Sequence, residues 1–559
     1  MGYFATLSFL AGITVCSAPL AAQQQTIPNA NPIANPFESV GTQNQPNQNT
    51  GSNADLPAPT IEAQWPQNDA VAAQSNASSV TIGAINVTPV SKLPSGSLAS
   101  SYEKFIGMEA NEENLRALAS AVSEAARDQG FIFASAQIPP QAVKIGVVSV
   151  LLDPGPIDEV RILGSQNRRL RKILNLLQSD AATSDEVKRQ LLLAGDLPGI
   201  IVQNTSYLRE NGRGVLVVTV KEDRVRGYAA LDNYGSNTLG PVRARINYTV
   251  SELLSDDDSL SVNAVTSIVQ PDELAYLNIR YAATLGDGST LVGFTGAVGR
   301  TYTGGSLRDF NFRGRNQYAS LFASHALKRS PEFNLWLNTE LGYQRTVQSQ
   351  DGVRFQDDDI VTASLNFAGN YDIGFGRIYG GIGVTRGLGI LGSSRTGDLL
   401  NSRDNGSGSF TKANIWVNSI LNMGSGYGVR LAANGQIASR PLLASNEIAI
   451  GGPYFGKGYD FGERFGDEGV MGLAEVRKEF NNVTDWLDWF QLYGFVDGGY
   501  VTNIGTGFGD GALASAGGGM RAQIGKIDLG VEAAAPVTDD RIESADKSPK
   551  VNMQLGVRF

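Results

Sequence analysis

Cysteine and histidine are almost absent from this chain of 559 residues, since it has only Cys16 and His325. A single cysteine excludes an internal disulfide framework, and a single histidine excludes a histidine-based zinc cluster or a Ser-His-Asp triad. We interpret His325 as a barrel-lining strand residue. The acidic runs Asp256–Asp258 and Asp357–Asp359 are interpreted as solvated residues of connections rather than as calcium ligands. We therefore expect no metal, no cofactor and no enzymatic activity.

Charge is also scarce, and positive charge is in deficit. Only 18% of the residues are charged, the net charge is -10 and the isoelectric point is about 4.9. A nucleic-acid binder would show a basic stripe, so nucleic-acid partners are not expected. Beyond the N-terminus no apolar run approaches the roughly 20 residues of a membrane helix. A membrane protein of this sequence must therefore be a closed barrel, because only helices and closed barrels satisfy all their backbone groups in lipid.

The N-terminal part has two predicted regions. Residues 1–22 read as a signal peptide, although no Lys or Arg precedes the apolar run, and cleavage is expected after Ala22 or Ala18. Cys16 lies in this segment, so the mature chain would have no cysteine. Residues 23–78 are rich in Gln, Asn, Pro and Ser and are predicted to be a disordered linker. Their seven prolines argue against a stable helix, unless one forms in 60–75.

Two successive segments share one pattern of strand, helix and two strands, which indicates an internal repeat. The first unit is 79–155, where an apolar helical stripe runs through Leu115 to Ala125. The second is 156–225, where Thr183 and Glu186 form a capping box for a helix.

From residue 226 to 559 helical periodicity is replaced by alternation of apolar and polar residues, as in strands with one lipid face and one wet face. Short and long connections alternate, the long ones at about 301–315, 347–358, 388–407, 439–468 and 536–549. The sequence therefore predicts α+β domains followed by an all-β barrel of about 16 antiparallel strands. The strand centres are predicted near residues 230, 246, 262, 278, 294, 322, 339, 364, 381, 415, 432, 474, 495, 517, 531 and 555.

The last nine residues, Val551–Phe559, alternate without exception and end on an aromatic residue. This pattern is typical of the strand that closes an outer-membrane barrel. It must pair with the first strand near Tyr228–Asn233 to remove the last open sheet edges.

Four segments carry a resemblance to one family. Phe131–Gln141 followed by Gly146–Gly155 resembles the first POTRA domain of the hemolysin secretion/activation family, the transporters of two-partner secretion. Leu191–Ile200, with its Leu-Pro-Gly turn, resembles the second POTRA domain, and Leu231–Gly240 resembles the first barrel strand and its loop. Ile450–Tyr459 with the residues after it resembles the long sixth loop and the next strand: Gly451, Gly452, Gly456, Gly466, Asp467, Glu475 and Arg477.

The resemblance implies that loop 439–468 folds back into the barrel lumen. The family's loop motif is Val-Arg-Gly-Tyr, and its Arg pairs with the Asp of a Phe-x-Asp motif on an inward-facing strand. Here the matching residues are Lys457-Gly458-Tyr459 and Phe495-Val-Asp497. Lysine cannot make a forked contact, so we expect a loop latch that is weaker or differently shaped.

The resemblance implies an outer-membrane transporter whose POTRA domains lie in the periplasm. It would capture an unfolded hemolysin- or adhesin-like exoprotein, which carries its own N-terminal secretion domain, and pass it through the barrel pore. Candidate substrate contacts are Phe131, Phe133, Gln137, Pro198 and Gly199. Further expected partners are outer-membrane lipid and the barrel-assembly machinery, which would read Phe559; the protein is expected to be a monomer. Two alternatives remain. One is an assembly factor of the insertase type, which is disfavoured because this chain has two POTRA units rather than about five. The other is a passive porin-like channel.

Overall fold

The structure is a computed structural model that describes residues 61–63, 80–88, 92–94, 96–139 and 146–559. The expected signal peptide and, apart from Ile61–Ala63, the expected linker 23–78 lie outside the described residues. The chain divides into an α/β unit, which contains 51–223, and a barrel unit, which contains 224–328 and 332–559. In the described part, no helix combines the length and the apolar character needed to cross a lipid bilayer.

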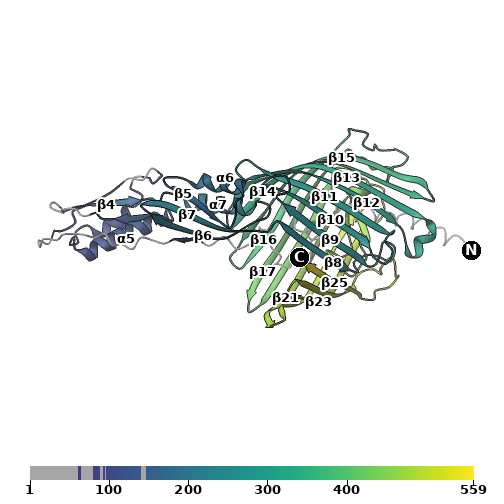
Figure 1. Cartoon of the computed structure of the whole chain (residues 1–559). Coiled ribbons are helices and arrows are strands. Elements are labelled where there is room, and N and C mark those ends of the chain that lie inside the picture. Colours follow the sequence, from purple (N-terminus) through teal and green to yellow (C-terminus); the bar gives the residue numbers. More distant parts are fainter. Residues whose placement is uncertain (1–60, 64–79, 89–91, 95, 140–145) are drawn as a thin grey trace, which may run out of the picture. The chain divides into compact units, whose positions relative to one another are not determined.

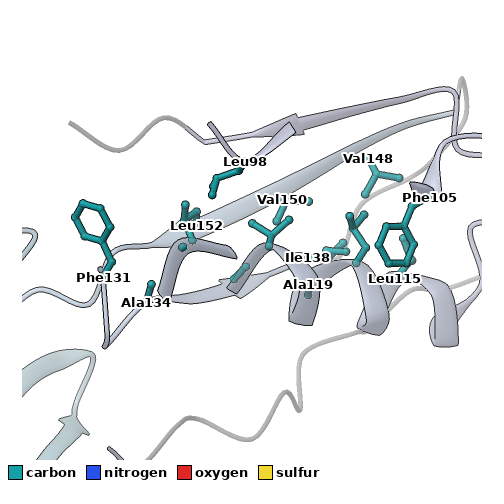
Figure 2. Close-up of a cluster of buried hydrophobic side chains, with 14 of the residues drawn as sticks. Leu98, Phe105, Leu115, Ala119, Phe131, Ala134, Ile138, Val148, Val150 and Leu152 are labelled. Atoms are coloured by element: carbon teal, nitrogen blue, oxygen red, sulfur yellow. The ribbon is translucent and has the colours of Figure 1, made fainter. Parts of the chain in front are cut away.

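The first half of the α/β unit packs one amphipathic helix on a three-stranded sheet of order β2-β4-β3. Helix α5 begins after Asn111, whose side chain accepts a hydrogen bond from the amide of Asn114 at 2.8 Å. Figure 2 shows the side chains of α5 and β4 meeting in a common apolar core. Its elements are β2 (Ala84–Val87), α4 (Ala99–Tyr102), η2 (Glu103–Phe105), α5 (Glu112–Asp128), β3 (Ser135–Gln137) and β4 (Val147–Asp153).

The second half repeats this topology, with strands in the order β5-β7-β6 and with α6 and α7 between β5 and β6. The predicted capping box is confirmed: the Thr183 hydroxyl accepts from the Glu186 amide, and the Glu186 carboxylate accepts from the Thr183 amide. The internal repeat therefore exists in three dimensions. Its elements are β5 (Glu159–Leu163), α6 (Arg168–Leu174), η3 (Asn175–Leu177), α7 (Ser184–Gly195), β6 (Ile200–Glu210) and β7 (Arg213–Glu222).

One strand of this second sheet comes from elsewhere in the chain. Strand β1 (Ile61–Ala63) pairs in parallel with Thr205–Tyr207 of β6, so a piece of the predicted linker covers the β6 edge of the sheet. In the first half, the strand that corresponds to β6 is β3, which is an edge strand of its own three-stranded sheet.

The described residues from 225 onward form a closed barrel of sixteen strands (Figure 1). Each of the sixteen predicted strand centres lies within a different one of these strands. Each barrel strand pairs with its neighbour in the chain, and β25 pairs with β8. The strands are β8 (Val225–Asp232), β9 (Arg243–Ser251), β10 (Asp258–Ser267), β11 (Leu274–Leu285), β12 (Thr290–Tyr302), β13 (Phe312–Arg329), β14 (Phe333–Gln350), β15 (Val353–Asp372), β16 (Gly376–Leu388), β17 (Thr411–Gly424), β18 (Tyr427–Ala438), β21 (Glu468–Thr484), β22 (Leu487–Thr502), β23 (Gly511–Ile524), β24 (Ile527–Pro536) and β25 (Lys550–Arg558).

The seam between β25 and β8 closes as the terminal pattern predicts. Gln554 to Arg558 pair with Asp232 to Tyr228, and Phe559 exchanges two backbone hydrogen bonds with Gly227, at 2.8 and 2.9 Å. The apolar positions of the last strand are all exposed on the outer face, whereas Asn552 is buried on the inner face. Alternation with period 2 therefore sorts the residues between lipid and lumen.

One predicted connection is wrong. Residues 347–358 were expected to form a long loop, but β14 and β15 continue through them and are joined by a tight turn at Asp351-Gly352, where both residues have positive φ. Consequently Asp357 and Asp359 lie within β15. Arg345 binds Asp357 with two hydrogen bonds of 2.9 Å, so a cross-strand ion pair explains this acidic run better than a turn does.

Candidate functional site

The connection between β18 and β21 lies against the inner wall of the barrel. Its strands β19 (Ile448–Ile450) and β20 (Arg464–Gly466) form a small hairpin. Apolar residues of the loop join inward-facing residues of β18, β21, β22 and β23 in one buried cluster: Ile448, Ile450, Phe455, Tyr459, Ala432, Met471, Leu473, Val501 and Leu513. Burial of this apolar surface holds the loop on the wall.

Glycines allow the tip of this loop to approach the wall closely. Gly456 has φ +77°, a conformation that side chains rarely adopt. Gly458 lies against the backbone of β24, so that an added Cβ would be 2.7 Å from the nitrogen of Pro536 and 2.8 Å from the carbonyl carbon of Ala535. Gly451 and Gly452 also have positive φ, and Gly451 donates a 2.9 Å hydrogen bond to the carbonyl of Phe455.

Asp497 holds the tip through its backbone. The carboxylate accepts hydrogen bonds from the amides of Gly456, at 2.9 Å, and Lys457, at 3.1 Å, and its second oxygen accepts from the hydroxyl of Ser515. Asp497 points inward from β22, as its alternation with Val496 predicts, and is only 6% exposed. Both oxygens of this carboxylate are therefore occupied by neutral donors.

The side chain of Lys457 goes elsewhere, which corrects the expected side-chain contact with Asp497. Its ammonium nitrogen lies 2.7 Å from a carboxylate oxygen of Glu532 on β24, and the side chain is 1% exposed. The nitrogen also lies 4.2 Å from the ring centroid of Phe495. A desolvated lysine needs such a counter-charge, and the aromatic face adds a cation–π contribution.

A glycine run on β23 makes this arrangement possible. Gly519 stands in register between Tyr493 of β22 and Glu532 of β24. Without a side chain there, the Tyr493 hydroxyl crosses β23 and donates a 2.9 Å hydrogen bond to Glu532, whereas an added Cβ on Gly519 would be 2.6 Å from that hydroxyl. Gly517 leaves room for the ring of Phe495 in the same way, since an added Cβ would be 2.8 Å from its tip.

A second ion pair adjoins the first. Arg521 of β23 binds Glu475 of β21 with two hydrogen bonds of 3.0 Å and stacks 3.7 Å from the ring centroid of Tyr493. Sequence reasoning singled out Glu475 and Arg477, but it missed Arg521, Glu532 and Ser515. Of these, Glu532 had a signal: it is an acid at an inward position of a predicted strand, next to the glycine-rich β23.

The two ends of the loop are anchored to other connections of the barrel. Asp467, which is fully buried, accepts from the amide of Leu442 at 2.6 Å, from the amide of Ile504 at 2.8 Å and from Arg403 at 2.7 Å. Arg403 comes from the connection between β16 and β17 and also pairs with Glu447 at 3.1 Å. Three connections of the barrel are thus tied together by one arginine and one aspartate.

The other predicted site residues have different positions. Tyr459 is buried, and its hydroxyl lies 2.9 Å from that of Thr538 after β24. Arg477 is buried and lies 3.3 Å from Glu479 on the same strand. An added Cβ on Gly466 would meet the backbone of Thr502.

The predicted substrate contacts of the α/β unit are mostly buried, which corrects their expected role. Phe131 and Phe133 are 3% and 2% exposed. The ring of Phe133 stacks on Tyr207 with a centroid distance of 4.1 Å, and the Tyr207 hydroxyl donates to the carbonyl of Pro156. Burial raises the pKa of Tyr207 to about 12, so this hydroxyl stays protonated at neutral pH. These rings join the two halves of the unit.

The remaining residues of this group divide between surface and turn. Gln137 is exposed at the end of the edge strand β3. Pro198 is partly exposed, whereas Gly199 is buried with φ +76°, and its carbonyl accepts from the amide of Asp223 at 2.8 Å. Gly199 therefore serves the turn from α7 into β6.

Comparison with known families gives two matches. The profile of the family described as haemolysin secretion/activation protein ShlB/FhaC/HecB matches residues 212–522, and that of the ShlB-type POTRA domain matches residues 80–155. Among curated proteins, the chain is similar to the heme/hemopexin transporter protein HuxB of Haemophilus influenzae strain 86-028NP. The two are 24% identical over 469 residues, which is 80% of this chain and 82% of that protein.

Solved structures with a similar fold include CdiB from Escherichia coli, with a TM-score of 0.71 and 18% identity over 91% of this chain and 95% of that one. CdiB from Acinetobacter baumannii has a TM-score of 0.62 and 17% identity over 90% of this chain and 95% of that one. BamA from Haemophilus ducreyi lacking POTRA domains 1–3 has a TM-score of 0.51 and 14% identity, over 86% of this chain and all of that one. These structural likenesses show the fold.

Proposed function

Because the chain belongs to the haemolysin secretion/activation (ShlB/FhaC/HecB) family, we propose that it captures one exported polypeptide in the periplasm and passes it, unfolded, through its barrel to the cell surface. Membership implies an outer-membrane translocator of an exoprotein. The observation that carries the finer proposal is the buried loop, which occupies the inner wall and is held there by an apolar cluster and by polar contacts around Lys457 and Asp497. A passive pore would not need such a loop.

Capture would use the sheet edges of the α/β unit, whose second half we propose to be a second POTRA domain. Edge strand β3 and the covered strand β6 occupy equivalent places in the two repeats. An unfolded chain can add to such an edge through main-chain hydrogen bonds, which do not demand one sequence. On β6 the incoming chain would displace β1, and on β3 it would pass the exposed Gln137. Pro198 remains the second candidate contact.

Passage of the polypeptide would require the loop to leave the wall. Besides the buried apolar cluster and the anchors at Asp467, docking of the tip depends on the amide contacts to Asp497 and on the Lys457–Glu532 pair. An arriving chain that offers hydrogen bonds and apolar side chains can replace these contacts one by one. The loop would thus act as a gate that is stable without substrate and displaced by it.

The barrel would be oriented with its long connections at the cell surface and the opposite end, which carries turns such as 286–289, in the periplasm, as is general for outer-membrane barrels. The tight turn at Asp351-Gly352 would then lie at the cell surface. Phe559 would then end the last strand on the periplasmic side, where the barrel-assembly machinery reads it. The cargo would be a large exported protein of the hemolysin or adhesin type with its own N-terminal secretion domain. The name of the relative HuxB makes a hemopexin-binding exoprotein the first candidate.

The cysteine-free mature sequence permits a direct test. Asn338 faces the lumen and its neighbour Thr339 faces outward on β14. In cells that express the partner exoprotein with one cysteine and a stalling domain, Asn338→Cys should form a disulfide with the stalled chain, and Thr339→Cys should not. Equal cross-linking at both positions, or none at Asn338→Cys while secretion continues, contradicts passage through the lumen. Loss of unrelated outer-membrane proteins after depletion would favour the assembly-factor alternative.

A further inference from the structure

Two arginines face each other on the outer surface of the barrel. Arg300 of β12 and Arg315 of β13 are register partners, and both are exposed. They lie on the face that carries Val298, 53% exposed, and Leu321, 65% exposed. Asn316, the residue after Arg315, is fully buried toward the lumen. Both guanidinium groups therefore project from the lipid-facing side near the ends of their strands.

This placement is unfavourable unless an anion is bound. Like charges directly opposite on neighbouring strands repel each other, and arginine on the lipid face of a barrel is destabilising, although less near the strand ends than at the bilayer midplane. In the described part of the chain, neither guanidinium has a carboxylate within ion-pair distance. A third cation, Arg313, lies two residues before Arg315 on the same face, where its guanidinium lies over the ring of Tyr302 and donates to the side chain of Asn311.

The barrel neutralises an outward arginine elsewhere. Arg345 on β14 also faces outward, and it binds Asp357 on β15 with two hydrogen bonds of 2.9 Å. The protein can therefore supply a carboxylate at such a position. Its absence beside Arg300 and Arg315 indicates that their counter-charge comes from another molecule.

A groove with a volume of about 850 Å³ reaches these arginines. It runs across the outer surface of the strands, from β25 through β8 to β13. Two adjacent rows of outward-facing residues border it along this path. Small side chains such as Ala264 and Ala275 leave room for it, and Leu277 and Val298 make it apolar, while Arg300 and Arg315 line one end. The groove thus offers an apolar channel with a cationic end, which fits an acyl chain joined to a phosphate.

We propose that this surface binds one phosphorylated glycolipid of the outer leaflet, with its phosphate on Arg300 and Arg315 and an acyl chain in the groove. The assignment to the outer leaflet rests on the proposed function, which puts the long connections, and hence this end of β12, at the cell surface. Arginine forks bind phosphate oxygens in pairs, which removes the repulsion between the two cations. The lipid would thereby link β12 to β13, which lie in the half of the barrel that contains the β25–β8 seam.

The test uses the full-length protein in phosphatidylcholine nanodiscs that contain increasing fractions of diphosphorylated lipid A, with bound lipid counted by native mass spectrometry. We expect saturable retention of one lipid A, weakened about tenfold by Arg300→Gln or by Arg315→Gln, since each removes a charge-assisted contact. The matched control is Arg386→Gln, an exposed outward arginine on β16 whose register partners are Ala363 and Thr411. It should retain lipid A like the wild type.

Two results would overturn the inference. One is equal retention of lipid A by the wild type and the Arg300→Gln/Arg315→Gln double variant, with both barrels shown to be folded by their resistance to unfolding in cold detergent. The other is displacement of lipid A by inorganic phosphate together with no effect of Ala264→Leu, which narrows the groove; this would show an anion site without a lipid. Since the assay contains no exoprotein, failure here leaves secretion untouched, and failure of secretion leaves lipid binding measurable.

Discussion

The ammonium group of Lys457 and the carboxylate of Glu532 form an ion pair of 2.7 Å inside the barrel, two strands away from the aspartate that the loop motif was expected to contact. Asp497 is already occupied by two loop amides and by Ser515. The tip of the loop is therefore held by two separate acids, one that binds its backbone and one that binds its lysine.

Replacement of Glu532 by glutamine should release the loop. The change keeps the shape of the side chain but leaves the buried ammonium of Lys457 without a counter-charge, a defect that costs about 3–5 kcal/mol. We expect faster hydrogen exchange at Gly456–Tyr459, a larger open-channel conductance and reduced secretion. The control is Asp540→Asn, which removes an exposed acid from the connection after β24. Unchanged exchange in Glu532→Gln would exclude the pair as an anchor.

Removal of both charges should restore much of the docking. Lys457→Met alone leaves Glu532 buried and unpaired apart from its hydrogen bond with Tyr493. Both single changes leave one buried charge without its partner. The double variant Lys457→Met/Glu532→Gln should therefore lose less free energy of loop docking than the two single variants lose together, by about 0.5–3 kcal/mol in a mutant cycle. Additive free energies of loop release, measured by hydrogen exchange, would show that the two residues act independently.

Gly458→Ala should displace the loop tip without altering any charge. Its Cβ would lie 2.7 to 3.0 Å from backbone atoms of Ala535 and Pro536, which cannot move without bending β24. We expect protease sensitivity within residues 451–463 to rise. Gly296→Ala on β12 is the matched control, because its added Cβ would meet nothing within 4 Å. Equal protection in the two variants would contradict close packing of the tip.

Arg403→Ala should loosen the connections that meet at Asp467. The substitution leaves Asp467 and Glu447, both buried, without their shared cation. It also removes three hydrogen bonds, one to the carbonyl of Ile504 at 3.1 Å and two to that of Thr506 at 2.9 and 3.3 Å. We expect protease cleavage of residues 389–410 on intact cells. Arg395→Ala, an exposed arginine of the same connection, should stay resistant. Resistance of Arg403→Ala as well would mean that backbone contacts alone hold these connections.

Phe133→Ala should uncouple the two halves of the α/β unit. The side chain is 2% exposed and stacks on Tyr207, so its loss should cost about 3–5 kcal/mol of stability. Hydrogen exchange should accelerate in both β3 and β6, whereas Ile132→Ala, at a partly exposed neighbour, should change it much less. Acceleration confined to β3 would show that Phe133 serves only the first half.

Much of the fold could be predicted because strand alternation is a local property. Each of the sixteen strands, the inward direction of Asp497 and the pairing of Phe559 with the first strand follow from period 2 and from the need to close the sheet. The connection at 347–358 was mispredicted because its acidic residues resemble a turn. Only the paired strands show that Arg345 forms ion pairs with Asp357 and Asp359.

The sequence by itself determined the residues that face lipid, the residues that face the lumen and the place where the barrel closes, since each depends on neighbours along one strand. Tertiary structure alone decided that Lys457 meets Glu532, because the oxygens of Asp497 are occupied by loop amides and Ser515, whereas Glu532 lies 2.7 Å from the ammonium nitrogen. It also decided that Phe133 joins two domains instead of meeting a substrate. Contacts between distant segments depend on register and packing, which no local pattern encodes.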